Sequence, residues 1–148
     1  MKTSAIVLFL LCFTLSGFTS AEKNAEEGIK VNIINLRNSN GRVLISLFKD
    51  GIGYPDQPEK AFRKTSISIT DNQAFFLFTD IPFGNYAIAI LHDENDDKQM
   101  NKNSLGLPKE GYGFSNNVMG AFGPPAYTRV KFSHKANTFK IVNIKARY

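Results

Sequence analysis

The sequence predicts an all-β fold, an antiparallel sandwich of about seven strands with one long irregular loop. Short stretches in which apolar and polar residues alternate recur along the chain, and turn-forming residues separate them. Such a series of short strands is typical of two packed sheets. No stretch has the apolar periodicity of an amphipathic helix. The length of 148 residues fits one domain.

The first 21 residues have the layout of a secretory signal peptide. Lys2 gives a positive start, residues 5–18 form an apolar run that is short for a membrane span, and small residues end at Ala21. Residues 22–28 are polar and predict a flexible leader, and residues 29–148 form the predicted domain. We therefore expect an exported protein, periplasmic or extracellular, with no transmembrane span in the mature chain. An uncleaved N-terminal anchor is the alternative.

Cysteine content and charge narrow the class of protein. The single cysteine, Cys12, lies within the apolar run, so the 127 residues after Ala21 contain none. A domain of that size can bury an adequate core without disulfides. Loss of residues 1–21 removes Lys2 and no acid, which lowers the formal net charge from +5 to +4. The basic residues are scattered and no basic cluster is interleaved with aromatic residues, so we expect no nucleic-acid partner.

The first two strands are predicted at residues 29–36 and 42–48. Asn38 to Gly41 lies between them, and its Asn-Gly pair tolerates positive φ, which predicts a tight hairpin. In the second strand Val43, Ile45 and Leu47 share one face because they alternate with polar residues. Residues 49–61 predict a loop with a short helical turn, since prolines and glycines follow one another closely.

Further strands are predicted on both sides of the long loop. Apolar residues occupy both faces of residues 74–79, which is typical of a central strand. In the first segment after the loop, alternation places Val130 and Phe132 inward. The four predicted segments are residues 65–70, 74–79, 127–134 and 138–146.

A turn followed by a tyrosine precedes the strand that leads into the long loop. Pro82 and Gly84 predict a chain reversal, after which Tyr86, Ile88 and Ile90 form one face of a strand. This phrase resembles the turn and tyrosine of transthyretin-like and carboxypeptidase-regulatory-like sandwiches, and it is similar to the tyrosine corner of immunoglobulin-like domains. The resemblance implies an immunoglobulin-like or transthyretin-like sandwich. It also implies a ring that packs inward and a hydroxyl that bonds to the backbone near the turn.

Residues 92–117 form the long loop, and its polar start has the spacing of a cation site. Asp93, Asn95 and Asp97 alternate, so their oxygens can converge on one hard cation in a turning loop. A backbone carbonyl near Gln99 and the side chain of Asn101 would complete the shell. With so few carboxylates a calcium ion would bind weakly, in the range of roughly 10⁻⁴–10⁻³ M. The alternative is a solvated loop whose Asp and Asn side chains cap their own turns.

The loop and the segment after it resemble one family of exported bacterial proteins. His92-Asp93-x-Asn95, residues 106–117 and Gly123-Pro124-Pro125 are similar to the pattern HDxNxNGxxD, GxPxEGxGFSNN and GPP of domain of unknown function 2141. The resemblance implies an exported location and a sandwich fold, with no established activity. Lys98 stands where that family has a glycine, and Asn101 where it has an aspartate.

Six residues of the loop are candidates for ligand binding. For His92, which ends a strand, a structural role with hydrogen-bonded nitrogens is the alternative. Glu110 lies next to glycine and can accept backbone N–H groups. The Tyr112 and Phe114 rings either cover the core as a lid or form an exposed platform for a ligand. The set is His92, Glu110, Tyr112, Phe114, Asn116 and Asn117.

These features predict an exported binding or interaction module for an unknown envelope ligand or protein. An alternative is a hydrolase-type enzyme that acts on an envelope component through His92 with Asp93 or Glu110. Adjacent residues of a strand point to opposite faces, which spoils the relay geometry of a His92–Asp93 pair with Ser115. A purely structural envelope component is the third hypothesis. No cofactor is indicated other than the weakly bound calcium ion.

Overall fold

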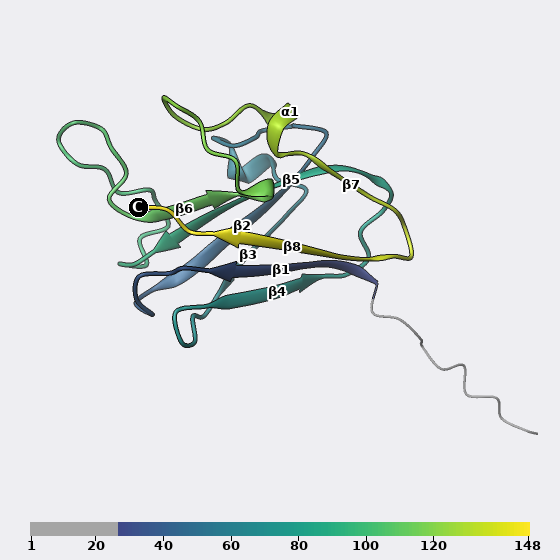
Figure 1. The fold of residues 1–148 in the computed structure, drawn as a ribbon, viewed down its shortest axis with the longest axis horizontal. Helices are drawn as coiled ribbons and strands as arrows, with labels where there is room; N and C mark the ends of the chain where they lie inside the picture. The colour runs from purple at the N-terminus through teal and green to yellow at the C-terminus, as the bar shows by residue number, and fades with distance from the viewer. Residues whose placement is uncertain (1–26) are drawn as a thin grey trace, which may run out of the picture.

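Two β-sheets packed face to face form the fold of residues 27–148, the part of the chain that this computed structural model describes (Figure 1). The predicted signal peptide and residues 22–26 of the predicted leader lie outside the described residues. Among the described residues, no helix has the length and apolar character needed to cross a membrane. The elements are β1 (Gly28–Ile34), β2 (Arg42–Lys49), η1 (Pro58–Lys60), β3 (Arg63–Ile67), β4 (Ala74–Phe78), β5 (Gly84–Asp93), β6 (Gly111–Phe114), η2 (Ser115–Asn117), α1 (Tyr127–Val130), β7 (Phe132–His134) and β8 (Phe139–Lys145).

One sheet has the strand order β4-β1-β8, and the other has the order β3-β2-β5-β6 with β7 paired to the start of β5. The predicted all-β sandwich is thus confirmed. Its strand pairs are antiparallel except for β1 with β8, which run parallel from Gly28–Phe139 to Ile34–Lys145. The turn after β7 places the carbonyl of Thr138 next to Gly28, whose N–H donates to it at 2.9 Å. Both strands therefore start at the same end of the sheet.

Side chains of alternating residues fill the space between the sheets. The predicted inward face of β2 is confirmed, and buried residues also alternate with less buried ones along β1 and at the end of β8. In β5 both faces are covered, because Ile88 lies in the core between the sheets and Ala87 in a second cluster. Burying an aliphatic side chain of this size contributes about 1.5–3 kcal/mol. The fully buried members are Ile29, Val31, Ile33, Val43, Ile45, Leu47, Tyr86, Ile88, Ile144 and Ala146.

The tyrosine at the start of β5 has the geometry implied by its resemblance to a tyrosine corner. The Tyr86 hydroxyl donates to the carbonyl of Pro82 at 2.9 Å, and the ring lies in the core against Phe62, with centroids 5.8 Å apart. Burial raises the pKa of the Tyr86 hydroxyl, helped by the negative charge of Asp50 and opposed by Arg63. The hydrogen bond and the packed ring of Tyr86 thus connect the turn at Pro82 to the core.

The hairpin predicted at Asn38–Gly41 is wrong, because β1 and β2 belong to different sheets. This turn carries the chain across the sandwich. Gly41 has a φ of 62°, and a Cβ there would lie within 2.8 Å of the Glu94 carbonyl carbon. The chain does turn at Asn38–Gly41, but the two strands that flank the turn do not pair with each other.

The prediction of a central strand at residues 74–79 is also wrong. β4 is an edge strand of the three-stranded sheet, and Phe75 on its outer face is 74% exposed. The Lys30 ammonium lies 5.6 Å from the centroid of that ring. The apolar residues of β4 therefore lie on two different faces, one buried against the core and one exposed on the outside of the sheet.

Two further segments differ from the prediction. Tyr127–Val130 forms one helical turn, and only Phe132–His134 continues as a strand, although Val130 and Phe132 are buried as predicted. Gly111–Phe114, inside the predicted loop, forms an eighth strand. A Cβ at Gly113 would lie 2.8 Å from the Ile144 side chain, so this strand needs glycine to approach β8.

His134 at the end of β7 predicts an acid-sensitive stability. The side chain is 2% exposed, and burial lowers its pKa, opposed in part by a hydrogen bond to the Ile81 backbone. The unfolded chain takes up this proton at about pH 6.5, whereas the folded state resists it, so stability falls as pH drops from about 6.5 to the folded pKa. An NMR titration should place the His134 ring midpoint below that of a model histidine, and a midpoint at or above it would contradict the prediction.

Candidate functional site

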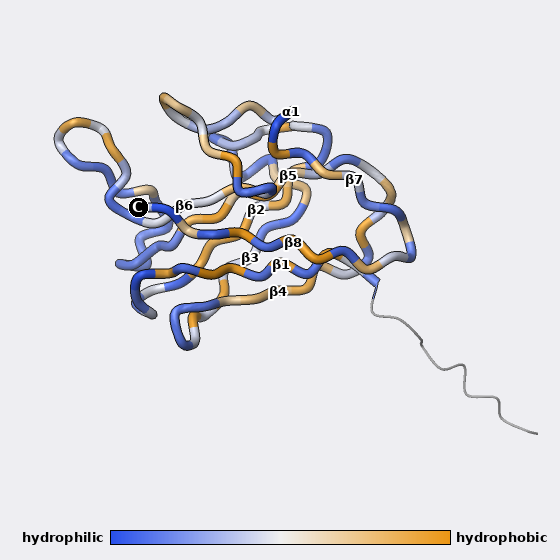
Figure 2. The backbone as a smooth tube through the Cα atoms, viewed as in Figure 1, coloured by the Kyte–Doolittle hydropathy of each residue, from blue (hydrophilic) through white to orange (hydrophobic). Residues whose placement is uncertain are grey.

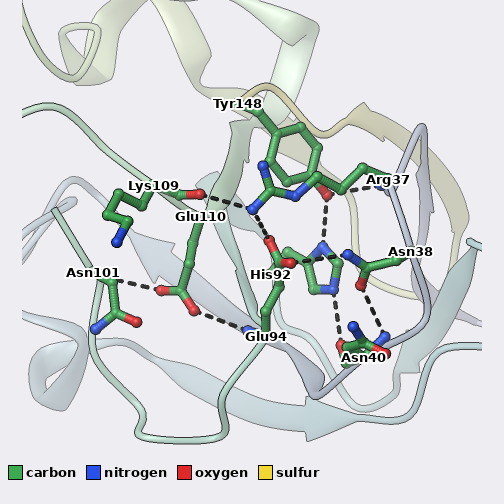
Figure 3. A network of polar contacts seen from close by, with 9 residues as sticks. All are labelled: Arg37, Asn38, Asn40, His92, Glu94, Asn101, Lys109, Glu110 and Tyr148. Atoms are coloured by element: carbon green, nitrogen blue, oxygen red, sulfur yellow. Dashed lines mark hydrogen bonds and ion pairs between the residues drawn. The ribbon is translucent and has the colours of Figure 1, made fainter. Parts of the chain in front are cut away.

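His92 lies at the end of β5 with its side chain wholly buried and both ring nitrogens engaged (Figure 3). Nε2 lies 2.9 Å from the carbonyl oxygen of Asn40, and Nδ1 lies 2.6 Å from the hydroxyl of Tyr148. Because a carbonyl only accepts, Nε2 carries a proton and donates. In the neutral ring Nδ1 then accepts from Tyr148, whose oxygen accepts the N–H of Arg37 at 3.0 Å. His92 thus links three segments, which is the structural role considered above.

Arg37 extends this network toward the surface. Its guanidinium carbon lies 4.5 Å from the centroid of the Tyr148 ring, and Nη2 forms an ion pair with Oε1 of Glu94 at 2.6 Å. The same Nη2 donates to the carbonyl of Lys109 at 3.0 Å. Burial raises the pKa of the Tyr148 hydroxyl, as does the negative charge of Glu94. The contact with the Tyr148 ring, the ion pair with Glu94 and the hydrogen bond to the Lys109 carbonyl together hold the Arg37 guanidinium in one orientation.

Glu94 is the carboxylate that receives this guanidinium. Its other oxygen accepts from the Asn38 amide at 2.9 Å. Burial acts to raise the pKa of Glu94, but hydrogen bonds from Asn38 and Arg37, with the positive charge of Arg37, lower it overall. The group is held as a carboxylate.

Glu110 fastens the long loop to the start of β6. Its side chain is 4% exposed, Oε1 accepts the N–H of Glu94 at 2.9 Å, and Oε2 accepts the N–H of Asn101 at 3.0 Å. Each oxygen therefore closes one end of the segment between them (Figure 3). The interpretation of Glu110 as a loop-closing acceptor is confirmed.

The polar start of the loop is held by hydrogen bonds among its own residues. Asp93 is fully buried, and its two oxygens accept the N–H groups of Asp97 at 3.1 Å and Lys98 at 2.8 Å. The Asp97 carboxylate accepts from the Asn95 and Asn101 amides and from the N–H of residue 99. Hydrogen bonds from Asn101 and then Asn95 lower the pKa of Asp97.

This arrangement bears on the predicted cation site. Within residues 27–148, no three His, Asp or Glu side chains are grouped as a metal site would require. Gln99 contributes its N–H to the network. Lys98 has a φ of 63°, which lies in the left-handed region that favours glycine. The hydrogen bonds match the alternative in which the side chains cap their own turns.

Calcium is therefore expected to leave the melting temperature unchanged, since the Asp93 oxygens already accept two N–H groups. Replacing Asp93 with Asn removes the charge and one acceptor, and should lower the free energy of unfolding by about 1–2 kcal/mol. Thermal melts in calcium and in chelator measure both effects. A melting temperature that rises with calcium in the native protein, and not in Asp93→Asn, would establish the cation site instead.

The three residues after β6 connect separate backbone segments. The Ser115 hydroxyl donates to the carbonyl of Val130 at 2.7 Å and accepts the N–H of Ile88 at 3.0 Å. The Asn116 amide donates to two carbonyls around the end of α1, at 3.1 and 3.3 Å. Asn117 accepts an N–H of β8 at 2.7 Å and donates to a carbonyl of the same strand at 3.0 Å. The side chains of Asn116 and Asn117, predicted as ligand contacts, are thus engaged with the backbone.

Tyr112 and Phe114 form part of a second, smaller core. Phe114 is 6% exposed and contacts Tyr112 and Tyr54, each with centroids 6.0 Å apart. Val130 and Tyr127 of α1 cover the same cluster. The rings therefore pack under the segment that follows β6, as in the lid interpretation, and form no exposed platform.

An open polar cleft remains beside this network. It has a volume of about 390 Å³ and contains three basic residues, two carboxylates and two amides. Of the basic residues, Lys102 and Lys109 make no ion pair within residues 27–148. The lining residues are Arg37, Glu94, Asn95, Asn101, Lys102, Lys109 and Glu110.

A family model described as uncharacterized protein conserved in bacteria (DUF2141) matches residues 31–142. The chain belongs to the DUF2141 family. Neither a curated protein nor a solved structure matches it. The matched residues include the cleft and the block that follows it. Tyr148, the hydrogen-bond partner of His92, lies outside the DUF2141 match.

Asn95 and Asn101, predicted as cation ligands, and Glu110, predicted as a ligand contact, line this cleft, whereas its cationic residues were not predicted. Lys102 and Lys109 could have been noticed because they flank a short apolar turn within the polar loop. Arg37 and Tyr148 carry no local signal, since neither belongs to a motif.

Proposed function

We propose that this DUF2141 protein is an exported binding module whose cleft takes a small ligand with a carboxylate or phosphate group. The observation that carries the proposal is that Lys102 and Lys109 both line an open cleft and neither makes an ion pair within residues 27–148. A cleft with unpaired cations attracts anions.

The other charges of the cleft support an anionic ligand. Glu94 is paired with Arg37, and Glu110 accepts two backbone N–H groups, so both carboxylates have donors. Arg37 is already oriented by the Tyr148 ring and the Lys109 carbonyl. A guanidinium held in this way loses little side-chain entropy when it binds a carboxylate or phosphate.

The hydrolase-type alternative has no observation in its favour. Both nitrogens of His92 are engaged in hydrogen bonds, and the oxygens of Asp93 and Glu110 accept backbone N–H groups. A general base needs a lone pair that can reach the substrate. These residues support the loop and leave the binding module as the better proposal.

Export is supported by the layout of residues 1–21, with Lys2, the apolar run and the small residues before Glu22. The protein recovered outside the cytoplasm should begin at or near Glu22. N-terminal sequencing measures this directly, and an intact Met1 on cytoplasmic protein would refute it.

Binding at the cleft can be tested with the protein that begins at Glu22, which keeps every element of both sheets. We expect titration with inorganic phosphate or with succinate to shift the backbone amide signals of residues 94–110 and Arg37. The stronger of the two probes identifies the anionic group. The Lys102→Ala/Lys109→Ala variant should weaken this binding about tenfold, as expected for the loss of two charge contacts.

The matched control is Lys131→Ala/Lys145→Ala, which removes two exposed lysines away from the cleft. It should bind as the native protein does. Equal weakening in both double variants would show a general charge effect and overturn the proposed site, as would signal changes spread over the whole surface.

A further inference from the structure

Residues 101–109 form a braced hairpin that projects from the body of the protein (Figure 1). Backbone N–H groups of Asn103 and Lys109 donate to the carbonyls of Leu107 and Asn101, each at 2.9 Å. The Asn103 side chain accepts the N–H groups of Leu105 at 2.9 Å and Leu107 at 3.0 Å. This set of bonds fixes the shape of the hairpin tip before any partner arrives.

The tip of the hairpin is apolar and faces solvent (Figure 2). Leu105 is 81% exposed and Leu107 is 57% exposed. Gly106 between them has a φ of 78°, and a Cβ there would meet no other atom within 4 Å. The two leucines therefore lie largely in solvent and form an exposed apolar tip that an external partner can cover.

The charge around the tip has one sign. Residues 98–109 contain three lysines (Lys98, Lys102 and Lys109) and no acid. The nearest acids, Asp97 and Glu110, have oxygens engaged in hydrogen bonds that hold the loop. The segment that carries the apolar tip is thus cationic.

We propose that the tip of this hairpin inserts into the surface of an anionic lipid bilayer. Leu105 and Leu107 enter the boundary between headgroups and acyl chains, and the lysines meet the negative headgroups. A protruding tip with two leucines offers little area to a protein partner, which commonly buries about 800 Å² on each side. A bilayer accepts a convex tip and supplies the complementary charge. The bilayer contact shares Lys102 and Lys109 with the proposed anion site of the cleft and differs from it in requiring Leu105 and Leu107.

Vesicle co-sedimentation of the protein that begins at Glu22 tests this inference. The native protein should bind vesicles of phosphatidylcholine with phosphatidylglycerol and should not bind vesicles of phosphatidylcholine alone. The Leu105→Ser/Leu107→Ser variant should bind the anionic vesicles about tenfold more weakly, because two apolar side chains no longer leave water. Both leucines are exposed, so this variant should keep the native melting temperature.

Phe75→Ser is the matched control, since Phe75, at 74%, has an exposed fraction between those of the two leucines but lies on the outer face of β4. It should bind as the native protein does. Native protein that stays in solution with anionic vesicles overturns the inference and leaves a protein partner for the tip. Undiminished binding by the leucine variant also overturns it, and places the lipid contact in the cleft if excess phosphate then releases the protein. The phosphate titration of the cleft should be unchanged in the leucine variant, so the two proposals fail separately.

Discussion

Replacing Glu110 with alanine is expected to lower the free energy of unfolding by about 3–5 kcal/mol, the sum of two hydrogen bonds to a charged acceptor. Glu110 is 4% exposed and accepts the N–H groups of Glu94 and Asn101. The variant leaves both donors without an acceptor, and it frees both ends of the segment that forms the cleft. Urea denaturation measures the loss.

Two variants distinguish the contribution of the two Glu110 hydrogen bonds from the loss of stability that any substitution in the loop would cause. Glu110→Gln keeps one carbonyl oxygen and should lose about half as much stability. Asn101→Ala keeps the backbone N–H that Glu110 accepts and removes only an exposed bond to Asp97, so its loss should be small. If Glu110→Ala is no less stable than Asn101→Ala, the hydrogen bonds that Glu110 accepts do not hold the loop in place.

Replacing Tyr86 with alanine should cost about 3–5 kcal/mol, the usual loss for an aromatic side chain removed from a packed core. The ring is fully buried against Phe62, so the alanine leaves a cavity between the sheets. Thermal or urea unfolding measures this loss, and a neutral effect would show that the ring does not belong to the core.

The Tyr86→Phe variant measures the hydroxyl separately. It keeps the ring and removes the bond to the Pro82 carbonyl, which should cost about 1 kcal/mol. A Phe variant as unstable as the Ala variant would mean that the turn at Pro82, and not the packed ring, carries the stabilisation.

Local alternation predicted the buried faces of the strands well. Val43, Ile45 and Leu47 share one face because a strand has a period of two, and this depends only on neighbouring residues. The geometry of the Tyr86 corner was predicted from a resemblance to other sandwiches, and its hydrogen bond is local, to a carbonyl four residues earlier.

The assignment of strands to sheets could not be predicted in the same way. The Asn38–Gly41 turn signals a reversal of the chain, but a reversal serves a hairpin and a crossing between sheets equally. Phe75 shows the same limit, because an apolar residue on the outer face of an edge strand has the pattern of a central strand. Only the packed fold distinguishes these cases.

In the candidate site, too, contacts within one segment could be predicted and contacts between distant segments could not. Glu110 was interpretable because its partners lie in the same loop, 16 and 9 residues away. Arg37 and Tyr148 lie 111 residues apart, and nothing in either neighbourhood indicates that they meet. The side chains of Asn116 and Asn117 resembled ligand contacts because an amide that serves the backbone and one that serves a ligand look alike in sequence.

The parallel pairing of β1 with β8 has a consequence for the order of folding. β1 lies between β4 and β8, and Asn32 reaches its partner Asn143 only across 111 residues of chain. Such pairings form slowly, because a long loop must close before the contact stabilises it. On a ribosome, the three-stranded sheet cannot be completed until residues 139–145 have emerged. The core between the two sheets is therefore incomplete until β8 has been synthesised.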